Sequence, residues 1–281
     1  MKILKKIDDV RQQLAKDRKD GLTVGLVPTM GALHNGHLSL VLKSQAMCQR
    51  TLVSIFVNPK QFGPDEDYVA YPRNLEADCA FLGKANVDYV FAPSVEEMWP
   101  AGNATSVEVE GLSHILVGKL RPGHFRGVTT VVAKLFNIVE PDFAFFGEKD
   151  YQQVVIIRRM VEDLAFPIKI ISLPILRDDD GVASSSRNQL LDKEDRKAAV
   201  VVPKSWKAAA ELFQKGERDI NALRHAIKNV LENEPRAFIE AIDFRDAETL
   251  EEVEDKISRP TVLLLTVRFG SVRLIDQYLF Q

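Results

Sequence analysis

Short apolar runs alternate with segments of helical periodicity along the first two thirds of the chain. The runs are rich in β-branched and aromatic residues and lie at 23–27, 51–57, 87–91, 143–147 and 168–172. Apolar residues recur at helical spacing in the segments between them, notably 37–49, 75–83, 128–139 and 151–164. Strands that are apolar on both faces and alternate with helices are typical of a parallel sheet with right-handed crossovers. We therefore predict an α/β fold, a Rossmann-like doubly wound parallel sheet.

The pattern of apolar and polar residues changes near Asp178. A polar turn at 178–181 is followed by three consecutive serines at 184–186, which cannot form a core. Beyond them come two helical patterns and three strand-like runs, at 198–214, 220–233, 238–244, 262–268 and 272–279. This order indicates a smaller C-terminal α+β domain with an antiparallel sheet, so we divide the chain into domains 1–176 and 177–281.

Composition adds limits on partners and location. The 281 residues are 46% hydrophobic, enough for a packed core, and 37 basic against 40 acidic residues leave a net charge of -3. This balance gives no field that would attract nucleic acid. Cys48 and Cys79 lie beside apolar neighbours and are expected to be buried, reduced thiols. The N-terminal apolar run is too short for a signal peptide, and no segment approaches the roughly 18 apolar residues of a membrane span, so we expect a cytoplasmic protein without membrane partners.

The first candidate site follows the first strand of the pattern, which is expected to end at Pro28. The segment 28–37 reads Pro-Thr-Met-Gly-Ala-Leu-His-Asn-Gly-His and leads into a helix. The carboxyl end of such a strand is where ligands bind in open α/β sheets, and the start of the helix offers unpaired N–H groups to a phosphate. His34 and His37 would face the same way and donate hydrogen bonds to ATP. A plain glycine-rich turn and half of a metal site are the alternatives.

The second and third candidates are also polar segments beside expected secondary structure. Gly147-Glu148-Lys149-Asp150 follows a hydrophobic strand, and Lys149 could neutralise the α-phosphate while Asp150 orients the ribose or Mg²⁺. An ordinary helix start with acidic capping explains the same residues. The run 184–188, Ser-Ser-Ser-Arg-Asn, suits a loop that folds over a triphosphate, or else a solvated linker. Gln61 and Gln153 could bind a small polar acid, or lie on the surface.

Together these motifs resemble those of the pantothenate synthetases, the pantoate-β-alanine ligases. The resemblance covers nearly the whole chain and is carried by 28–37, Phe56-Val57-Asn58-Pro59, Tyr71-Pro72-Arg73, Gly147-Glu148-Lys149-Asp150, Ser185-Ser186-Arg187-Asn188 and the last strands from Val267 to Asp276. Ser184 and Gln189-Leu190 depart from the commoner pattern of the family, at positions that bear on lid packing and ATP affinity rather than on the reaction.

The resemblance implies an ATP-dependent condensation of (R)-pantoate with β-alanine to pantothenate, through a pantoyl-adenylate, with release of AMP and pyrophosphate. It also implies Mg²⁺, a homodimer, a mobile C-terminal lid, and a place in pantothenate and coenzyme A biosynthesis. His37 is the residue assigned as proton donor, with His34, Lys149 and Arg187 also catalytic. Gln61 and Gln153 would hold pantoate, and β-alanine would enter beside Gln61. The residues expected to contact ATP are Met30, Gly31, Ala32, Leu33, His34, Asn35, Gly36, His37, Gly147, Glu148, Lys149, Asp150, Leu176, Ser184, Ser185, Ser186 and Arg187.

Two other functions use similar residues. A nucleotidyltransferase that adenylylates a phosphate-bearing acceptor shares the His-x-Gly-His device. A nucleotide-sensing module would keep the ATP pocket without turnover, although the intact histidines, Lys149 and Arg187 argue against it. No residue is assigned as a dedicated metal ligand.

Overall fold

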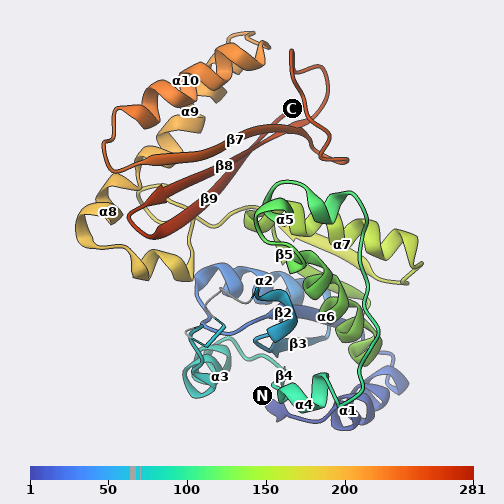
Figure 1. Cartoon of the computed structure of the whole chain (residues 1–281). Helices are drawn as coiled ribbons and strands as arrows, with labels where there is room; N and C mark the ends of the chain where they lie inside the picture. Colours follow the sequence, from blue (N-terminus) through green and yellow to red (C-terminus); the bar gives the residue numbers. More distant parts are fainter. Residues whose placement is uncertain (64–67, 70) are drawn as a thin grey trace. The chain divides into compact units, whose positions relative to one another are not determined.

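The computed structural model describes residues 1–63, 68–69 and 71–281, apart from the side chain of Ser186. The chain divides into two compact units (Figure 1). The first unit comprises Met1–Glu148 and Gln152–Pro174, and the second comprises Lys149–Tyr151 and Ile175–Gln281. The prediction that 1–176 and 177–281 are separate domains stays a prediction.

The first unit is built on a six-stranded parallel sheet with the order β1-β4-β3-β2-β5-β6. Its strands are β1 (Lys2–Leu4), β2 (Val24–Thr29), β3 (Arg50–Ile55), β4 (Tyr89–Phe91), β5 (Phe143–Gly147) and β6 (Lys169–Leu173). Its helices are α1 (Ile7–Lys19), α2 (Asn35–Met47), α3 (Leu75–Lys84), α4 (Val95–Met98), α5 (Val117–Leu120), α6 (His124–Val139) and α7 (Tyr151–Asp163), although the first residue of α7 groups with the second unit. Short 3₁₀ turns are η1 (Pro59–Gln61), η2 (Leu112–His114) and η3 (Glu148–Asp150).

Both faces of this sheet are buried. Neighbouring residues of one strand enter opposite cores: Leu26 packs in a cluster with side chains of α1, α6 and α7, whereas Val27 packs in a cluster with side chains of α2 and α3. The same division separates Leu52 from Val53. Alternation of side chains across a strand explains why strands covered on both faces are apolar throughout. The predicted doubly wound parallel sheet is confirmed.

The structure differs from the sequence pattern in two places. The pattern did not reveal β1 and α1, and the strand expected to end at Pro28 continues through Thr29. Pro28 pairs in register with Ser54 of β3, whereas the pairing of β2 with β5 involves Gly25 and Leu26. Proline is accepted there because its missing N–H would point toward the side on which pairing has already ended.

The second unit is a three-stranded antiparallel sheet packed with helices. It contains η4 (Ser186–Leu190), α8 (Lys193–Ala198), α9 (Val201–Gln214), α10 (Ile220–Glu232), β7 (Phe238–Asp246), β8 (Thr261–Phe269) and β9 (Val272–Phe280). The strand order is β7-β8-β9, and one hydrophobic core joins the sheet to α9 and α10. The predicted antiparallel α+β arrangement is confirmed, although the segment from 198 divides into α8 and α9.

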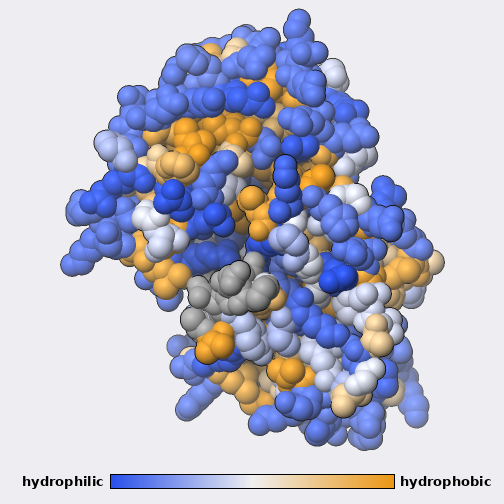
Figure 2. All heavy atoms as spheres, viewed as in Figure 1, coloured by the Kyte–Doolittle hydropathy of each residue, from blue (hydrophilic) through white to orange (hydrophobic). Residues whose placement is uncertain are grey.

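Hydrophilic residues cover most of the face shown in Figure 2, with hydrophobic side chains gathered in a few patches. Among the residues described, none of the helices has the length and apolar character needed to cross a bilayer.

Candidate active site

The site begins where the winding of the parallel sheet reverses direction. From β2 the chain proceeds to β3 and β4 on one side, and it later returns to β5 and β6 on the other side. The pairing of β2 with β3 runs along all of β2, but its pairing with β5 ends at Leu26, so the two strands part toward their carboxyl ends. Open α/β sheets bind ligands at such a switch point. The segments that leave it are 30–34, which follows β2, and Gly147-Glu148, which ends β5.

The segment after β2 has an unusual backbone. Gly31 and Ala32 both have positive φ, +84° and +51°, and Ala32 carries a Cβ that disfavours this conformation. The Asp78 carboxylate, on the first turn of α3, accepts hydrogen bonds from the amides of Ala32 at 3.1 Å and Leu33 at 2.9 Å. The loop is therefore held by a buried acid from another helix.

His34 and His37 form a reciprocal cap at the start of α2. The His34 Nδ1 atom accepts from the Gly36 amide at 3.1 Å, and the His37 Nδ1 atom accepts from the His34 amide at 3.3 Å. Their ring centroids lie 4.2 Å apart. Because each Nδ1 accepts an N–H, the tautomer that fits these contacts has its proton on Nε2. In this tautomer Nε2–H is the donor atom of each imidazole.

The same contacts correct one prediction about α2. We expected unpaired N–H groups at its start, but the Gly36 amide donates to His34 and the His37 amide donates to the His34 carbonyl at 2.9 Å. The helix N-terminus is satisfied by the chain itself. What this segment offers an anion is therefore imidazole donors rather than these two amides.

Gln61 is positioned by buried contacts at η1. Its Oε1 atom accepts from Asn58 Nδ2 at 3.1 Å, which leaves its Nε2 atom directed at the sulfur of Met30, also 3.1 Å away. Asn58 is itself held by Trp99 Nε1 at 3.1 Å and by the carbonyl of Gly127 at 3.0 Å. The amide of Gln61 is thereby fixed with its donor side toward the loop after β2.

Gln153 and Glu148 lie at the other strand of the switch point. Gln153 is half-buried on the first turn of α7. The Glu148 carboxylate accepts from Ser172 of β6 at 2.7 Å, and Ser172 in turn accepts from Arg158 at 2.7 Å. Glu148 is thus held in place by Ser172 of β6, which is itself bonded to Arg158 of α7.

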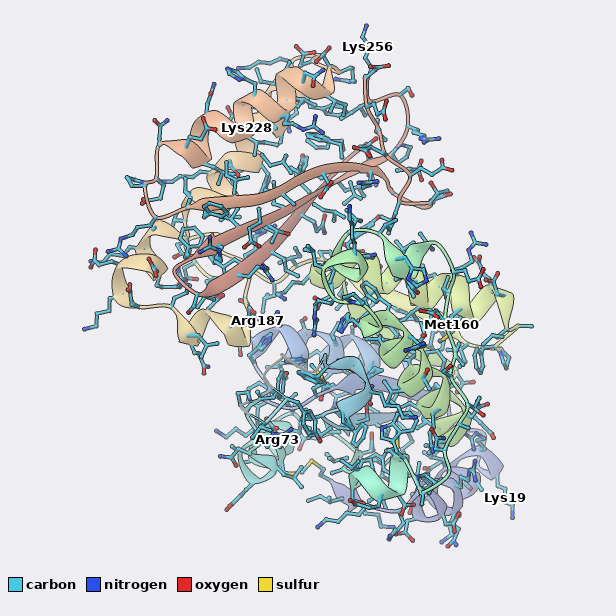
Figure 3. All side chains as sticks on the ribbon, viewed as in Figure 1. Lys19, Arg73, Met160, Arg187, Lys228 and Lys256 are labelled. Atoms are coloured by element: carbon cyan, nitrogen blue, oxygen red, sulfur yellow. The ribbon has the colours of Figure 1, made fainter. Side chains whose placement is uncertain are left out.

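The second unit brings Lys149 and Arg187 to one small cavity. Ser185 and Asp276 also line it. Lys149 is mostly buried and lies 3.9 Å from Asp150, whereas Arg187 is exposed (Figure 3). Two cations beside a serine hydroxyl form a site suited to phosphate oxygens.

The segment that carries Arg187 is anchored at its base. Leu176 accepts a backbone hydrogen bond from Ser184 at 2.9 Å, and the Ser184 hydroxyl donates to Asp178 at 2.5 Å. The Ser185 hydroxyl caps η4 by accepting from the Arg187 amide at 3.2 Å. The predicted contact through the side chain of Ser186 lies outside the described residues.

Asp78 is the residue near the site that the sequence did not reveal. An acidic residue in the first turn of a helix is an ordinary capping feature, so nothing in the pattern marked it.

Among the described residues, no group of three or more His, Cys, Asp or Glu side chains could hold a metal ion by itself.

The family model and the similar sequences point to the same protein family. The family model described as pantoate-beta-alanine ligase matches residues 2–279. The chain is 65% identical over 281 residues to the pantothenate synthetase of Bartonella quintana, covering 100% of this chain and 98% of that one. It is 50% identical over 281 residues to that of Acetivibrio thermocellus, covering 100% of both.

Solved structures agree over the full length. The crystal structure of pantothenate synthetase from Thermus thermophilus is 43% identical, with a TM-score of 0.93 and 99% of each chain covered. The pantoate-beta-alanine ligase of Francisella tularensis, complexed with beta-gamma ATP and β-alanine, is 34% identical, with a TM-score of 0.79 and coverage of 99% and 97%.

Proposed function

This chain belongs to the pantoate-β-alanine ligase family, and we propose that it joins pantoate to β-alanine in two steps at the switch point of the sheet. In the first step a carboxylate oxygen of pantoate attacks the α-phosphorus of ATP, and the bond to pyrophosphate breaks. In the second step the β-alanine amine attacks the acyl carbon of the pantoyl-adenylate, loses a proton, and displaces AMP. No covalent bond to the enzyme is required.

The histidine pair supports the role in phosphate binding. Because the Nδ1 atoms of His34 and His37 accept backbone N–H groups, we assign the Nε2–H of each ring to donate a hydrogen bond to a phosphate oxygen. Hydrogen bonds aimed at charge that grows in the transition state lower the barrier, so we assign the His37 Nε2–H to donate a hydrogen bond to the departing pyrophosphate. The two hydrogen bonds that the Nδ1 atoms accept are the observation that carries the proposal.

Lys149 and Arg187 supply the positive charge. We assign Lys149 to the α-phosphate and Arg187 to the outer phosphates, with the hydroxyl of Ser185 beside them. The remaining ATP contacts are those predicted from the sequence, between Met30 and His37, from Gly147 to Asp150, at Leu176 and from Ser184 to Arg187.

Gln61 and Gln153 are assigned to pantoate. The Nε2 atom of Gln61 is held toward Met30 and can donate to a hydroxyl or carboxylate oxygen of the substrate. β-Alanine, present in the F. tularensis complex, would enter beside Gln61. The C-terminal unit is assigned as the lid that excludes water from the adenylate.

The residues present fit a magnesium ion that is held chiefly by substrate. Mg²⁺ keeps several waters and is commonly bound by one or two carboxylates together with phosphates, so a cluster of protein ligands is not needed. Asp150, whose side chain is 52% exposed, is the carboxylate placed beside Lys149 to hold it. When bound, the ion neutralises phosphate charge.

The resemblance to the family supports two further assignments, a homodimer and a cytoplasmic location. Analytical ultracentrifugation measures the first, and a monomer at micromolar concentration contradicts it. Cell fractionation measures the second.

The reaction is tested by pantoate-dependent exchange of labelled pyrophosphate into ATP. Lys149→Ala removes a charge used in the transition state, so we expect a loss of at least about 10²-fold in the exchange rate. Lys19→Ala, at the exposed end of α1, is the matched control and should exchange at the wild-type rate. Exchange that Lys149→Ala leaves unchanged contradicts the proposal. Hydroxylamine should trap a hydroxamate, which a nucleotidyltransferase acting on a phosphate acceptor does not form.

A further inference from the structure

We propose that Asp78 is a positioning residue that holds the loop between β2 and α2 in the conformation that places His34 and His37. The proposal rests on the function assigned above, because it concerns the same imidazoles. It adds a residue that touches neither ATP nor pantoate in that assignment and acts through the backbone of Ala32 and Leu33.

The Asp78 carboxylate fits closely against the loop between β2 and α2. Asp78 is 5% exposed, and its two oxygens are divided between two consecutive amides, Ala32 to Oδ2 at 3.1 Å and Leu33 to Oδ1 at 2.9 Å. Bonds from backbone N–H groups to a carboxylate are stronger than those between neutral partners. A Cβ on Gly31 would lie 2.8 Å from Asp78 Oδ2, so the loop fits closely around the carboxylate.

The loop needs such support because part of it is unfavourable by itself. Ala32 has φ +51°, a conformation that costs a residue with a Cβ about 1 kcal/mol or more. Without the carboxylate, the chain gains by returning Ala32 to negative φ. This rotation would redirect the next residues, including His34, whose ring caps α2 and whose amide bonds to His37.

The first test is Asp78→Asn, which keeps the shape but sets an NH₂ group against one of the two amides. We expect pantoate-dependent pyrophosphate exchange to fall by about 10-fold to 10²-fold, since a displacement near 1 Å of catalytic groups costs up to about 10²-fold. Glu76→Gln is the matched control, because it makes the same chemical change at an exposed position on the same turn of α3. It should leave the exchange rate unchanged.

The second test separates positioning from a general effect on α3. Glycine tolerates positive φ, so Ala32→Gly added to Asp78→Asn should recover part of the lost exchange rate. Hydrogen exchange of the peptide 30–38 should be faster in Asp78→Asn than in wild type, and this measurement does not depend on turnover. Failure of the assigned function gives a different result, because the wild-type protein itself would then show no pantoate-dependent pyrophosphate exchange.

Three results overturn the proposal. They are a wild-type pyrophosphate exchange rate in folded Asp78→Asn, a loss of that rate which Ala32→Gly does not reduce, and unchanged hydrogen exchange in 30–38. If Asp78→Asn does not fold, Gly31→Ala perturbs the same contact from the loop, since its Cβ would press on Asp78 Oδ2. We expect slower pyrophosphate exchange for Gly31→Ala. A wild-type pyrophosphate exchange rate in this variant also overturns the proposal.

Discussion

Gly127 lets helix α6 approach the turn that carries Gln61, and Gly127→Ala tests how closely the proposed pantoate site depends on that packing. A Cβ at this position would lie 2.3 Å from the carbonyl oxygen of Lys60 and 2.6 Å from the Cα of Gln61. Both are backbone atoms, so the clash cannot be relieved by rotating a side chain. The turn η1 must move away from α6.

The size of the movement follows from these distances. Ordinary van der Waals contact begins near 3.4 Å, so relief requires a shift of roughly 1 Å. The shift would also stretch the bond from Asn58 Nδ2 to the Gly127 carbonyl, which is 3.0 Å long. Overpacking of this kind costs about 1–3 kcal/mol of stability, and misplacing a group that orients the substrate by about 1 Å costs up to about 10²-fold in rate.

Steady-state kinetics with pantoate, ATP and β-alanine measure the effect. We expect kcat/KM for pantoate to fall about 10-fold to 10²-fold, with a smaller change in KM for ATP, because Gln61 is assigned to pantoate. Gly83→Ala is the control, since a Cβ there meets no atom within 4 Å, and it should retain activity. Gly127→Ala with the wild-type kcat/KM for pantoate would refute the reasoning.

The remaining predictions concern caps, packing and pH. His34→Asn should keep the cap of α2 while losing the Nε2 donor, so thermal unfolding should stay near wild type while pyrophosphate exchange slows; His34→Ala should lose about 1 kcal/mol as well. Gly25→Ala places a Cβ 2.2 Å from Ser44 Oγ and should cost about 1–3 kcal/mol in urea unfolding; adding Ser44→Ala should cost less than the sum of the two single changes, and strict additivity would contradict this packing. The hydrogen bond from Arg196 holds the pKa of Asp180 below its ordinary value of 3.8, so the ion pair stabilises above that pH and is lost as the pH falls through the lower folded value. The free energy of unfolding of the wild type should therefore decline more steeply below pH 3.8 than that of Asp180→Asn, and parallel curves would exclude the contribution.

The hydrophobic pattern predicted the elements whose burial is most complete. The run 143–147 coincides with β5 because its central residues are buried on both faces and contain no polar side chain. The same logic fails for β1, which has only three residues, and for α1, where Val10 and Leu14 are the buried hydrophobic residues in a largely charged helix. Periodicity needs several buried positions in a row, and these elements do not supply them.

The candidate site was predictable to the extent that it follows strand ends. Glu148 could be placed because it comes directly after β5, and His34 and His37 because they lie in the loop and first helical turn that follow β2. Asp78 could not be placed, because its contact with Ala32 and Leu33 joins segments about 45 residues apart. The contact also depends on a positive φ at Ala32, which the sequence does not predict because alanine rarely adopts it. Long-range contacts to the backbone leave no local signature in a sequence.

The loop after β2 is held by hydrogen bonds within the chain. The amides of Gly31, Ala32, Leu33, His34, Gly36 and His37 all donate to acceptors within the chain. Such a loop does not wrap a phosphate in its own N–H groups, as a glycine-rich phosphate loop does. Its backbone hydrogen bonds hold the two imidazoles instead, so in the proposed reaction the charge that develops on pyrophosphate is met by Nε2–H donors and by cations. Preorganised donors require no rearrangement during the reaction, which is why the backbone contacts of this loop, and not only the residues that touch ATP, are expected to govern the rate of adenylation.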